Sequence, residues 1–218
     1  MIKNKVRIKI CGITNPRDAE AALDAGADAL GFNGFSGSKR FLDLQAAAGW
    51  MGELPPFVTR VAVLVNPSAQ EAREVAALPG IDRLQFHGHE TPEFCAPFAG
   101  TGFIKALAAK DAASLEAAAR YATGSILLDA YVPGAFGGTG CVIDWDLAAA
   151  FIRANRHLRV ILSGGLTPEN VAAAVRAVRP YAVDVASGVE SHPCKKDPSR
   201  MRDFIAAVRE AEAAEASF

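Results

Sequence analysis

Short apolar runs rich in β-branched residues alternate along this chain with longer, alanine-rich amphipathic runs. The short runs have the length of buried strands, whereas the longer runs repeat apolar residues at helical spacing. The predicted strands span residues 7–11, 28–32, 60–65, 82–87, 102–106, 125–129, 158–163 and 182–186. The predicted helices span residues 16–25, 43–52, 68–78, 91–98, 111–121, 144–155, 168–178 and 198–213. A strand followed by a helix is thus repeated along the whole chain.

Residues with capping chemistry stand beside several predicted helices. Thr91, Asp111, Asp144 and Thr167 occupy positions where a side-chain oxygen can accept hydrogen bonds from the first helical turn. Gly26 follows the first predicted helix, where glycine commonly reverses the chain. These residues support the predicted helix boundaries.

Eight such units in 218 residues predict an α/β protein built as one (β/α)8 TIM barrel, a single domain over residues 1–218. A doubly wound parallel sheet is the main alternative, but it commonly has about five or six strands and would not use all eight strand-and-helix units. No linker or low-complexity segment divides the chain. The last residues, 211–218, are expected to form a frayed tail.

The composition argues against nucleic-acid and membrane partners. Half of the residues are hydrophobic, and 23 Lys and Arg residues nearly balance 24 Asp and Glu residues, which leaves a net charge of −1. This balance lacks the basic surface that nucleic acids or anionic membranes require. No apolar stretch reaches the roughly 18 residues of a membrane helix, and the N-terminus has no signal-peptide core. Four scattered cysteines without a C-x-x-C motif indicate reduced thiols, so a cytoplasmic protein is expected.

In a barrel, the chemistry takes place where strands end and the following loops begin. Five predicted strands end on reactive or glycine-rich residues. These are Cys11-Gly12, His87-Gly88, Asp129, Ser163-Gly164-Gly165 and Ser187-Gly188. We therefore expect the functional residues at the carboxyl ends of these strands.

The late turns that contain Gly164, Gly165, Ser187 and Gly188 indicate a phosphate site. In barrels, the loops after the seventh and eighth strands commonly bind phosphate through backbone N–H groups, and glycine lets the anion approach them closely. A further loop, Gly137-Gly138-Thr139-Gly140, follows the sixth strand and could add donors. The alternative is that these glycines only form tight turns.

Cys11 and Asp129 are the candidate acid–base pair. Strand alternation places Cys11 on the face opposite Ile8 and Ile10, and places Asp129 opposite the outward Leu128. A thiol and a carboxylate then meet in one pocket, where one can act as base and the other as acid. The alternative for a lone cysteine is a small buried apolar residue.

The same alternation points the side chains of Lys9 and Asp184 into the barrel. They lie on the first and eighth strands, which are neighbours in a closed barrel. Unpaired charges there would be costly, so we expect Asp184 to neutralise Lys9.

Arg40 lies in a polar loop after the second strand, where its guanidinium could bind a substrate carboxylate. The alternative is a solvated surface arginine. His87 and His89 have the spacing of a chelating pair, but no third ligand is evident among four histidines. We therefore predict no metal.

Several of these motifs, in this order, resemble those of the phosphoribosylanthranilate isomerase family of tryptophan biosynthesis. The resemblance covers residues 9 to about 197. Its motifs are Lys9-Ile10-Cys11-Gly12-Ile13-Thr14, Leu84-Gln85-Phe86-His87-Gly88, Leu128-Asp129, Gly137-Gly138-Thr139-Gly140, Ser163-Gly164-Gly165-Leu166 with Pro168 and Asn170, and Asp184-Val185-Ala186-Ser187-Gly188-Val189-Glu190.

The resemblance implies a single barrel without cofactor or metal that performs an Amadori rearrangement of N-(5-phosphoribosyl)anthranilate. It assigns the general base to Cys11 and the general acid to Asp129. It gives Arg40 the anthranilate carboxylate and Asp184 a sugar-binding role. It places the phosphate on the turns around Gly138, Gly140, Gly164, Gly165, Ser187 and Gly188.

The chemistry fits these residue types. The acid must carry a proton for the ribose ring oxygen, and a closed, anion-containing pocket favours a protonated carboxyl group. The base must be a thiolate, and a free cysteine with a pKa of ~8.5 is only a few per cent thiolate at neutral pH. Lys9 would favour the thiolate, whereas the anionic substrate would oppose it.

Two departures from the family pattern affect these assignments. The loop before Arg40 commonly reads Ser-Pro-Arg, but here it is Ser38-Lys39-Arg40, so the placement of Arg40 is the least secure transfer. After Glu190, a usual Pro-Gly pair is replaced by Pro193-Cys194, and a modest effect on backbone geometry is expected.

The alternatives are another ribose-phosphate barrel isomerase and a non-catalytic phosphosugar-binding barrel. The histidine-pathway isomerase uses two aspartates at strand ends, whereas the first strand here ends in Cys11. A binding barrel would keep the glycine turns but lack the acid–base pair. The expected partner is a small phosphoribosyl substrate, and the sequence leaves open a monomer or a homodimer.

Overall fold

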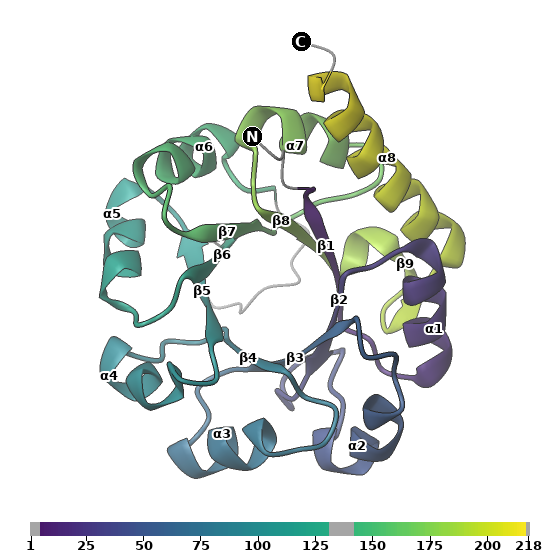
Figure 1. The fold of residues 1–218 in the computed structure, drawn as a ribbon, viewed down its shortest axis with the longest axis vertical. Helices are drawn as coiled ribbons and strands as arrows, with labels where there is room; N and C mark the ends of the chain where they lie inside the picture. The colour runs from purple at the N-terminus through teal and green to yellow at the C-terminus, as the bar shows by residue number, and fades with distance from the viewer. Residues whose placement is uncertain (1–4, 131–141, 217–218) are drawn as a thin grey trace.

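A computed structural model describes residues 5–130 and 142–216, and it contains a closed barrel of parallel strands ringed by helices (Figure 1). The barrel strands, paired in sequence order and closed by β1 against β8, are β1 (Arg7–Cys11), β2 (Ala29–Asn33), β3 (Thr59–Leu64), β4 (Arg83–Phe86), β5 (Phe103–Ala109), β6 (Ser125–Ala130), β7 (Arg159–Leu162) and β8 (Ala182–Val185). The α-helices are α1 (Pro16–Ala25), α2 (Leu44–Gly52), α3 (Ala69–Ala76), α4 (Pro92–Cys95), α5 (Ala112–Leu115), α6 (Trp145–Ala154), α7 (Val171–Val178) and α8 (Pro198–Ala216). The predicted (β/α)8 barrel is confirmed.

Three predicted helices differ from the structure. The α4 and α5 helices are single turns, continued by the 3-10 helices η1 (Ala96–Phe98) and η2 (Glu116–Arg120). Thr167 is not an N-cap, because α7 begins only at Val171. The Asn170 side chain accepts a hydrogen bond from the Thr167 N–H at 2.8 Å and donates one to the Gly165 carbonyl at 2.9 Å. These two bonds favour a turn where the sequence predicts the first helical residues.

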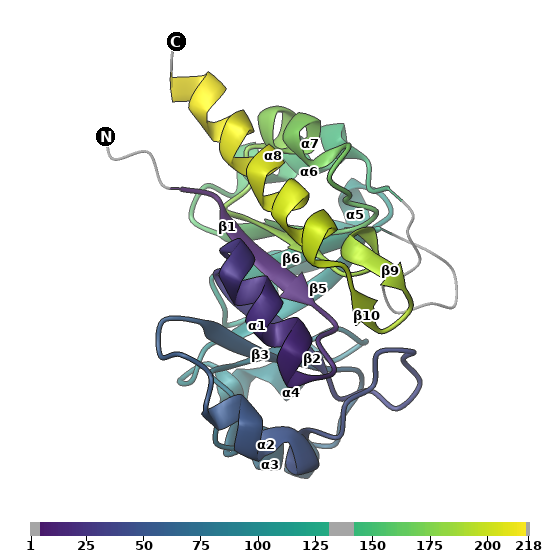
Figure 2. The same cartoon turned by 90° about the vertical axis from the view of Figure 1, so that its right-hand side faces the viewer.

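The C-terminal helix extends beyond its predicted end at residue 213. Helix α8 continues to Ala216, and Val208 and Ala211 are fully buried. It packs against α1 and α7, and Figure 2 shows its length along the side of the barrel. The Arg209 guanidinium donates to the Val6 carbonyl at 2.7 Å and to Glu212 at 2.8 Å. Ala211 is the last buried apolar residue in the described part of this helix, so the expected fraying of residues 211–218 stays a prediction.

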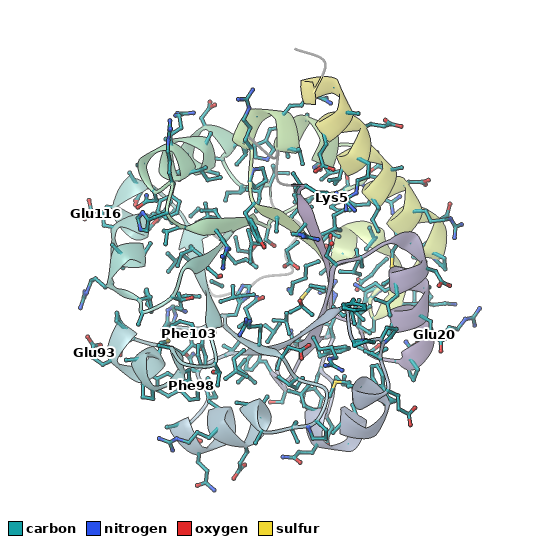
Figure 3. The ribbon with its side chains drawn as sticks, in the orientation of Figure 1. Lys5, Glu20, Glu93, Phe98, Phe103 and Glu116 are labelled. Atoms are coloured by element: carbon teal, nitrogen blue, oxygen red, sulfur yellow. The ribbon has the colours of Figure 1, made fainter. Side chains whose placement is uncertain are left out.

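The hydrophobic core has two layers, one on each face of the barrel wall. The larger layer fills the space between strands and helices and includes Phe98 and Phe103, which are labelled in Figure 3. The rings of both pack edge-on against Phe86. Glu20, Glu93 and Glu116 point outward from the ring. The smaller layer lies inside the barrel and consists of Val61, Ile104, Ala106, Leu127, Ile161 and Ala182. It forms the floor beneath the inward-facing polar residues.

A short antiparallel hairpin that the sequence did not predict follows the 3-10 helix η3 (Ser187–Val189). Its strands are β9 (Glu190–His192) and β10 (Lys195–Lys196), and they lie beyond the carboxyl end of β1 (Figure 2). The Thr14 hydroxyl in the loop after β1 donates to the Cys194 carbonyl at 3.3 Å. Cys194 turns the hairpin with φ of 68°, a left-handed conformation that favours glycine. The Gly-to-Cys departure noted in the sequence therefore falls where glycine would be least strained.

Replacing Cys194 with Gly is expected to raise the free energy of unfolding by about 1 kcal/mol, because glycine adopts this φ without steric cost. Chemical denaturation of the two proteins measures the difference. Cys194→Ala is the matched control, since it also removes the contact between the thiol and the Lys39 carbonyl but keeps the strain. An equal gain in Cys194→Ala would show that backbone strain is not the cause.

Candidate active site

Inward-facing polar side chains from four strands gather at the carboxyl ends of the barrel strands, beyond the internal apolar floor. Lys9, Gln85, Asp129 and Asp184 are all buried there. They alternate along their strands with apolar residues of the outer core layer, as the period of two requires. The predicted inward placement of Asp129 and Asp184 is therefore confirmed.

Cys11 ends β1 on this inner face and is partly buried. Gly31 on β2 faces it, and a Cβ atom at Gly31 would stand only 2.7 Å from the Cys11 Sγ. Gly31 thus provides the room that the thiol occupies. Burial raises the pKa of Cys11, while the charge and hydrogen bond of Lys9 and the charge of Lys196 oppose this rise without overcoming it.

The raised pKa of Cys11 predicts a thiol that ionises later than a free cysteine. Because burial disfavours the charged form, the thiolate fraction reaches one half only at a pH above ~8.5, the ordinary pKa of a cysteine. The difference in thiolate absorbance between the native protein and Cys11→Ser, followed against pH, isolates this group. A midpoint below the ordinary value would mean that the Lys9 ammonium outweighs burial.

The expected pairing of Lys9 with Asp184 is confirmed. The two residues face each other across β1 and β8, and Lys9 Nζ donates to Asp184 Oδ1 at 2.8 Å with both side chains buried. The Ser163 hydroxyl lies 3.4 Å from the other Asp184 oxygen. Burial alone would lower the pKa of Lys9, but the Asp184 and Cys11 charges raise it above its usual value. Lys9 therefore stays an ammonium beneath the thiol.

Replacing Lys9 with Met is expected to lower the free energy of unfolding by about 3–5 kcal/mol, because Asp184 would be left as an unpaired buried charge. Urea denaturation measures the loss. The double variant Lys9→Met with Asp184→Leu removes both charges and is expected to recover most of the stability. A single variant within about 1 kcal/mol of the native protein would contradict this account of the pair.

Asp129 lies at the end of β6 and is held on both oxygens. Its Oδ1 accepts from the Ala130 N–H at 2.9 Å, and its Oδ2 lies 3.2 Å from His87 Nε2. His87 in turn contacts the Gln85 amide, with 2.8 Å between Nδ1 and Nε2. The sequence predicts a hydrogen-bonded His87 at a strand end, and the structure shows that the candidate acid is one of its partners. In the described part of the chain, no three His, Cys, Asp or Glu side chains cluster as metal ligands would.

Arg40 reaches the mouth from the loop after β2, and its side-chain stem crosses Gly12, where a Cβ would collide with it. Its Nε and Nη2 each donate to a Glu190 oxygen at 2.7 Å. Glu190 also accepts from Lys196 Nζ at 2.9 Å. The Ser38 hydroxyl anchors the loop by accepting from the Arg40 N–H at 3.1 Å. Hydrogen bonding by Ser38 thus holds the loop that lacks the usual proline.

The charges of this ion-pair cluster keep its carboxylate ionised. Burial would raise the pKa of Glu190, but its bonds to Arg40 and Lys196 bring it below its usual value. The pKa of Lys196 is lowered, because its burial outweighs the pull of Glu190. In the sequence, Glu190 is only the last residue of a motif, and no pattern distinguishes Lys196 from the other lysines. The hairpin that brings Lys196 to the mouth left no periodic signal in the sequence.

The late glycine turns lie side by side after β7 and β8. Gly164 and Gly165 have φ of 86° and 63°, and a Cβ on Gly188 would collide with the Leu166 carbonyl. Among the described residues, no backbone hydrogen bond is donated by the N–H groups of Gly164, Gly165, Ser187 and Gly188. Predicted donors Gly138 and Gly140 lie outside the described residues. The turns therefore present N–H groups available to an anion.

Comparison with known proteins identifies the family. The family profile described as N-(5'phosphoribosyl)anthranilate (PRA) isomerase matches residues 8–207. The chain belongs to the PRA isomerase family. N-(5'-phosphoribosyl)anthranilate isomerase of Magnetococcus marinus is 49% identical over 207 residues, which cover 95% of this chain and 97% of the relative. The resemblance found in the sequence is thereby confirmed.

Solved PRA isomerases share the fold. The crystal structure of phosphoribosyl anthranilate isomerase from Thermotoga maritima has a TM-score of 0.84 and 40% identity, covering 94% of this chain and 99% of its own. A PRA isomerase in complex with reduced 1-(o-carboxyphenylamino)-1-deoxyribulose 5-phosphate has a TM-score of 0.81 and 38% identity, with the same two coverages. None of the helices in residues 5–130 and 142–216 combines the length and apolar character needed to cross a membrane.

Proposed function

We propose that this protein converts N-(5-phosphoribosyl)anthranilate to 1-(2-carboxyphenylamino)-1-deoxyribulose 5-phosphate. The observation that carries the proposal is the position of the candidate acid and base: Cys11 and Asp129 lie at the carboxyl ends of two different strands, and both face the interior at the same end of the barrel. The glycine turns beside them suit a phosphate. The names of the related isomerases, and the ligand of one solved relative, support the same reaction.

The first step opens the ribose ring. Protonated Asp129 gives its proton to the ring oxygen as the bond from that oxygen to C1 breaks, and the anthranilate nitrogen lone pair forms the C1=N bond. The Cys11 thiolate then removes the proton on C2, and the released electron pair forms a C1=C2 bond that neutralises the nitrogen. The enol-amine gains a proton at C1 and loses the O2 proton to become the ketone. No proton or electron is gained overall.

The remaining contacts orient the substrate. The N–H groups of Gly164, Gly165, Ser187 and Gly188, with those of Gly138 and Gly140, bind the phosphate. Arg40 binds the anthranilate carboxylate through the N–H groups of Nη1 and Nη2 that point away from Glu190, because Glu190 accepts from Nε and from one N–H of Nη2. Asp184, held by Lys9, accepts from a sugar hydroxyl.

Loss of phosphoribosylanthranilate fluorescence with purified protein tests the reaction, and chromatography against authentic product separates it from hydrolysis to anthranilate. Rapid loss with formation of the ketone is expected. Cys95→Ala is the matched control, because this cysteine lies on α4 outside the barrel mouth and its loss is expected to leave turnover unchanged. No turnover by the folded native chain would contradict the proposed function.

A further inference from the structure

The inner face of β4 carries a chain of hydrogen bonds that ends on Asp129. Leu84 and Phe86 face the outer core layer, so Gln85 and the next residue of that face, His87, point into the barrel. The Gln85 amide nitrogen lies 2.8 Å from His87 Nδ1, and His87 Nε2 lies 3.2 Å from Asp129 Oδ2. Neither Gln85 nor His87 has a part in the proton transfers described above.

The His87 main chain is fixed from both sides. Its N–H donates to the Leu64 carbonyl at 2.8 Å. The buried ammonium of Lys105 donates to the carbonyls of Phe86 and Gly88, at 3.2 and 2.8 Å, and pairs with Glu90 at 2.8 Å. These contacts lie on the outer side of the barrel wall, away from the reaction. The imidazole is therefore held in place by residues that do not contact Asp129.

The Gln85 amide selects one form of the His87 ring. A neutral imidazole carries its proton on one nitrogen and accepts on the other. An amide N–H that donates to Nδ1 requires Nδ1 to be the acceptor, which leaves the proton on Nε2. The Nε2–H then points at Asp129 Oδ2 and donates to it.

Gln85 itself gains little structural stability from this position. It is fully buried, yet its Oε1 has no hydrogen-bond partner among the described residues. A buried polar atom without a partner is unfavourable, and such groups call for a reason other than stability. Among the described residues, His87 is the hydrogen-bond partner of the Gln85 side chain.

We propose that Gln85 and His87 are positioning residues that prepare Asp129 for proton donation, an inference that rests on the proposed function. Gln85 holds the proton of His87 on Nε2. When Asp129 gives its proton to the ring oxygen it becomes a carboxylate, and the Nε2–H donates a hydrogen bond to that new charge. The hydrogen bond strengthens as the charge develops, so it lowers the barrier to ring opening.

The ring form can be measured without turnover. Nitrogen-15 spectra of the histidine rings, recorded near pH 8 where a free imidazole is neutral, distinguish a proton on Nε2 from one on Nδ1. The His87→Gln spectrum assigns the His87 signals. We expect the Nε2–H form in the native protein and a mixture of both forms in Gln85→Met. A native ring protonated on Nδ1, or an unchanged ring in Gln85→Met, would overturn the proposal.

Kinetics test the consequence. His87→Leu is expected to lower kcat by about 10- to 100-fold with KM within about threefold, because the lost bond belongs to the transition state. His87→Gln places an amide N–H near the lost Nε2–H and is expected to recover most of kcat. Gln85→Met is expected to lower kcat about 10-fold while its melting temperature does not fall, since it removes an unpaired buried oxygen. A merely structural role predicts the reverse: a lower melting temperature, no rescue by Gln and no selective change in kcat.

Failure of the proposed function would look different. If the native chain does not turn over phosphoribosylanthranilate, or if Asp129→Asn retains full kcat, the assignment of the acid is wrong. If both of those hold as expected but His87→Leu keeps native kcat, only the role of Gln85 and His87 is overturned.

Discussion

Replacing Cys11 with serine is expected to lower kcat by about 100-fold or more while the barrel remains folded. A serine hydroxyl has the same shape but is almost never ionised at neutral pH, so it cannot remove the C2 proton as a thiolate does. Gly31 leaves room for either side chain. The initial rate of fluorescence loss at saturating substrate measures kcat, and circular dichroism checks the fold.

Two comparisons make this result specific to the base. Cys95→Ala is expected to keep native turnover, because Cys95 lies on α4 away from the barrel mouth. The native protein is expected to lose activity to iodoacetamide, with substrate giving protection, whereas Cys11→Ser has no thiol there to alkylate. Turnover that survives in Cys11→Ser would leave the reaction in place but require another base.

Asp129→Asn is expected to lower kcat by about 100-fold or more with a small change in KM. The amide keeps the size of the carboxyl group, and its oxygen can still accept from His87 or Ala130. It has no acidic proton to give to the ring oxygen, so ring opening loses its acid. The same fluorescence assay measures the loss, and thermal unfolding shows whether the barrel is intact.

The result expected for Asp129→Asn can be separated from a binding defect. If the acid alone is lost, the variant still binds the reduced product analogue that a solved relative holds, and calorimetry measures that affinity. A kcat within about threefold of the native value would contradict the assignment of Asp129. The proton donor would then have to be sought among the neighbouring groups, with His87 the nearest at 3.2 Å.

The repeated strand-and-helix pattern predicted the barrel because each unit is specified locally. A strand places successive side chains on opposite faces, so the apolar residues at 8 and 10 are enough to turn Cys11 inward. The same argument predicted the inward Asp129 and the pairing of Lys9 with Asp184. Barrel closure makes β1 and β8 neighbours, so this contact follows from the topology once the strand count is known.

Boundaries were harder to predict where tertiary contacts compete with local propensity. The assigned helix α8 extends to Ala216, three residues beyond the predicted end at 213, and its packing against α1 and α7 adds to the weak helical preference of the segment itself. Asn170 makes a turn where Thr167 and Pro168 suggest a helix start. The end of α8 is supported by other helices, and the Asn170 turn is held by hydrogen bonds that form only in the folded loop.

The sequence by itself determined the fold class, the family and the two candidate acid–base residues, because each strand period and each motif is contained in a few consecutive positions. Tertiary structure alone decided which side chains contact the predicted site residues. The Arg40–Glu190 pair joins residues 150 positions apart, and His87 meets Asp129 across 42 positions. Such contacts depend on the curvature of the closed barrel and on loop paths such as the β9–β10 hairpin. No local pattern encodes them, since the energy of each contact exists only after the distant segments have been brought together.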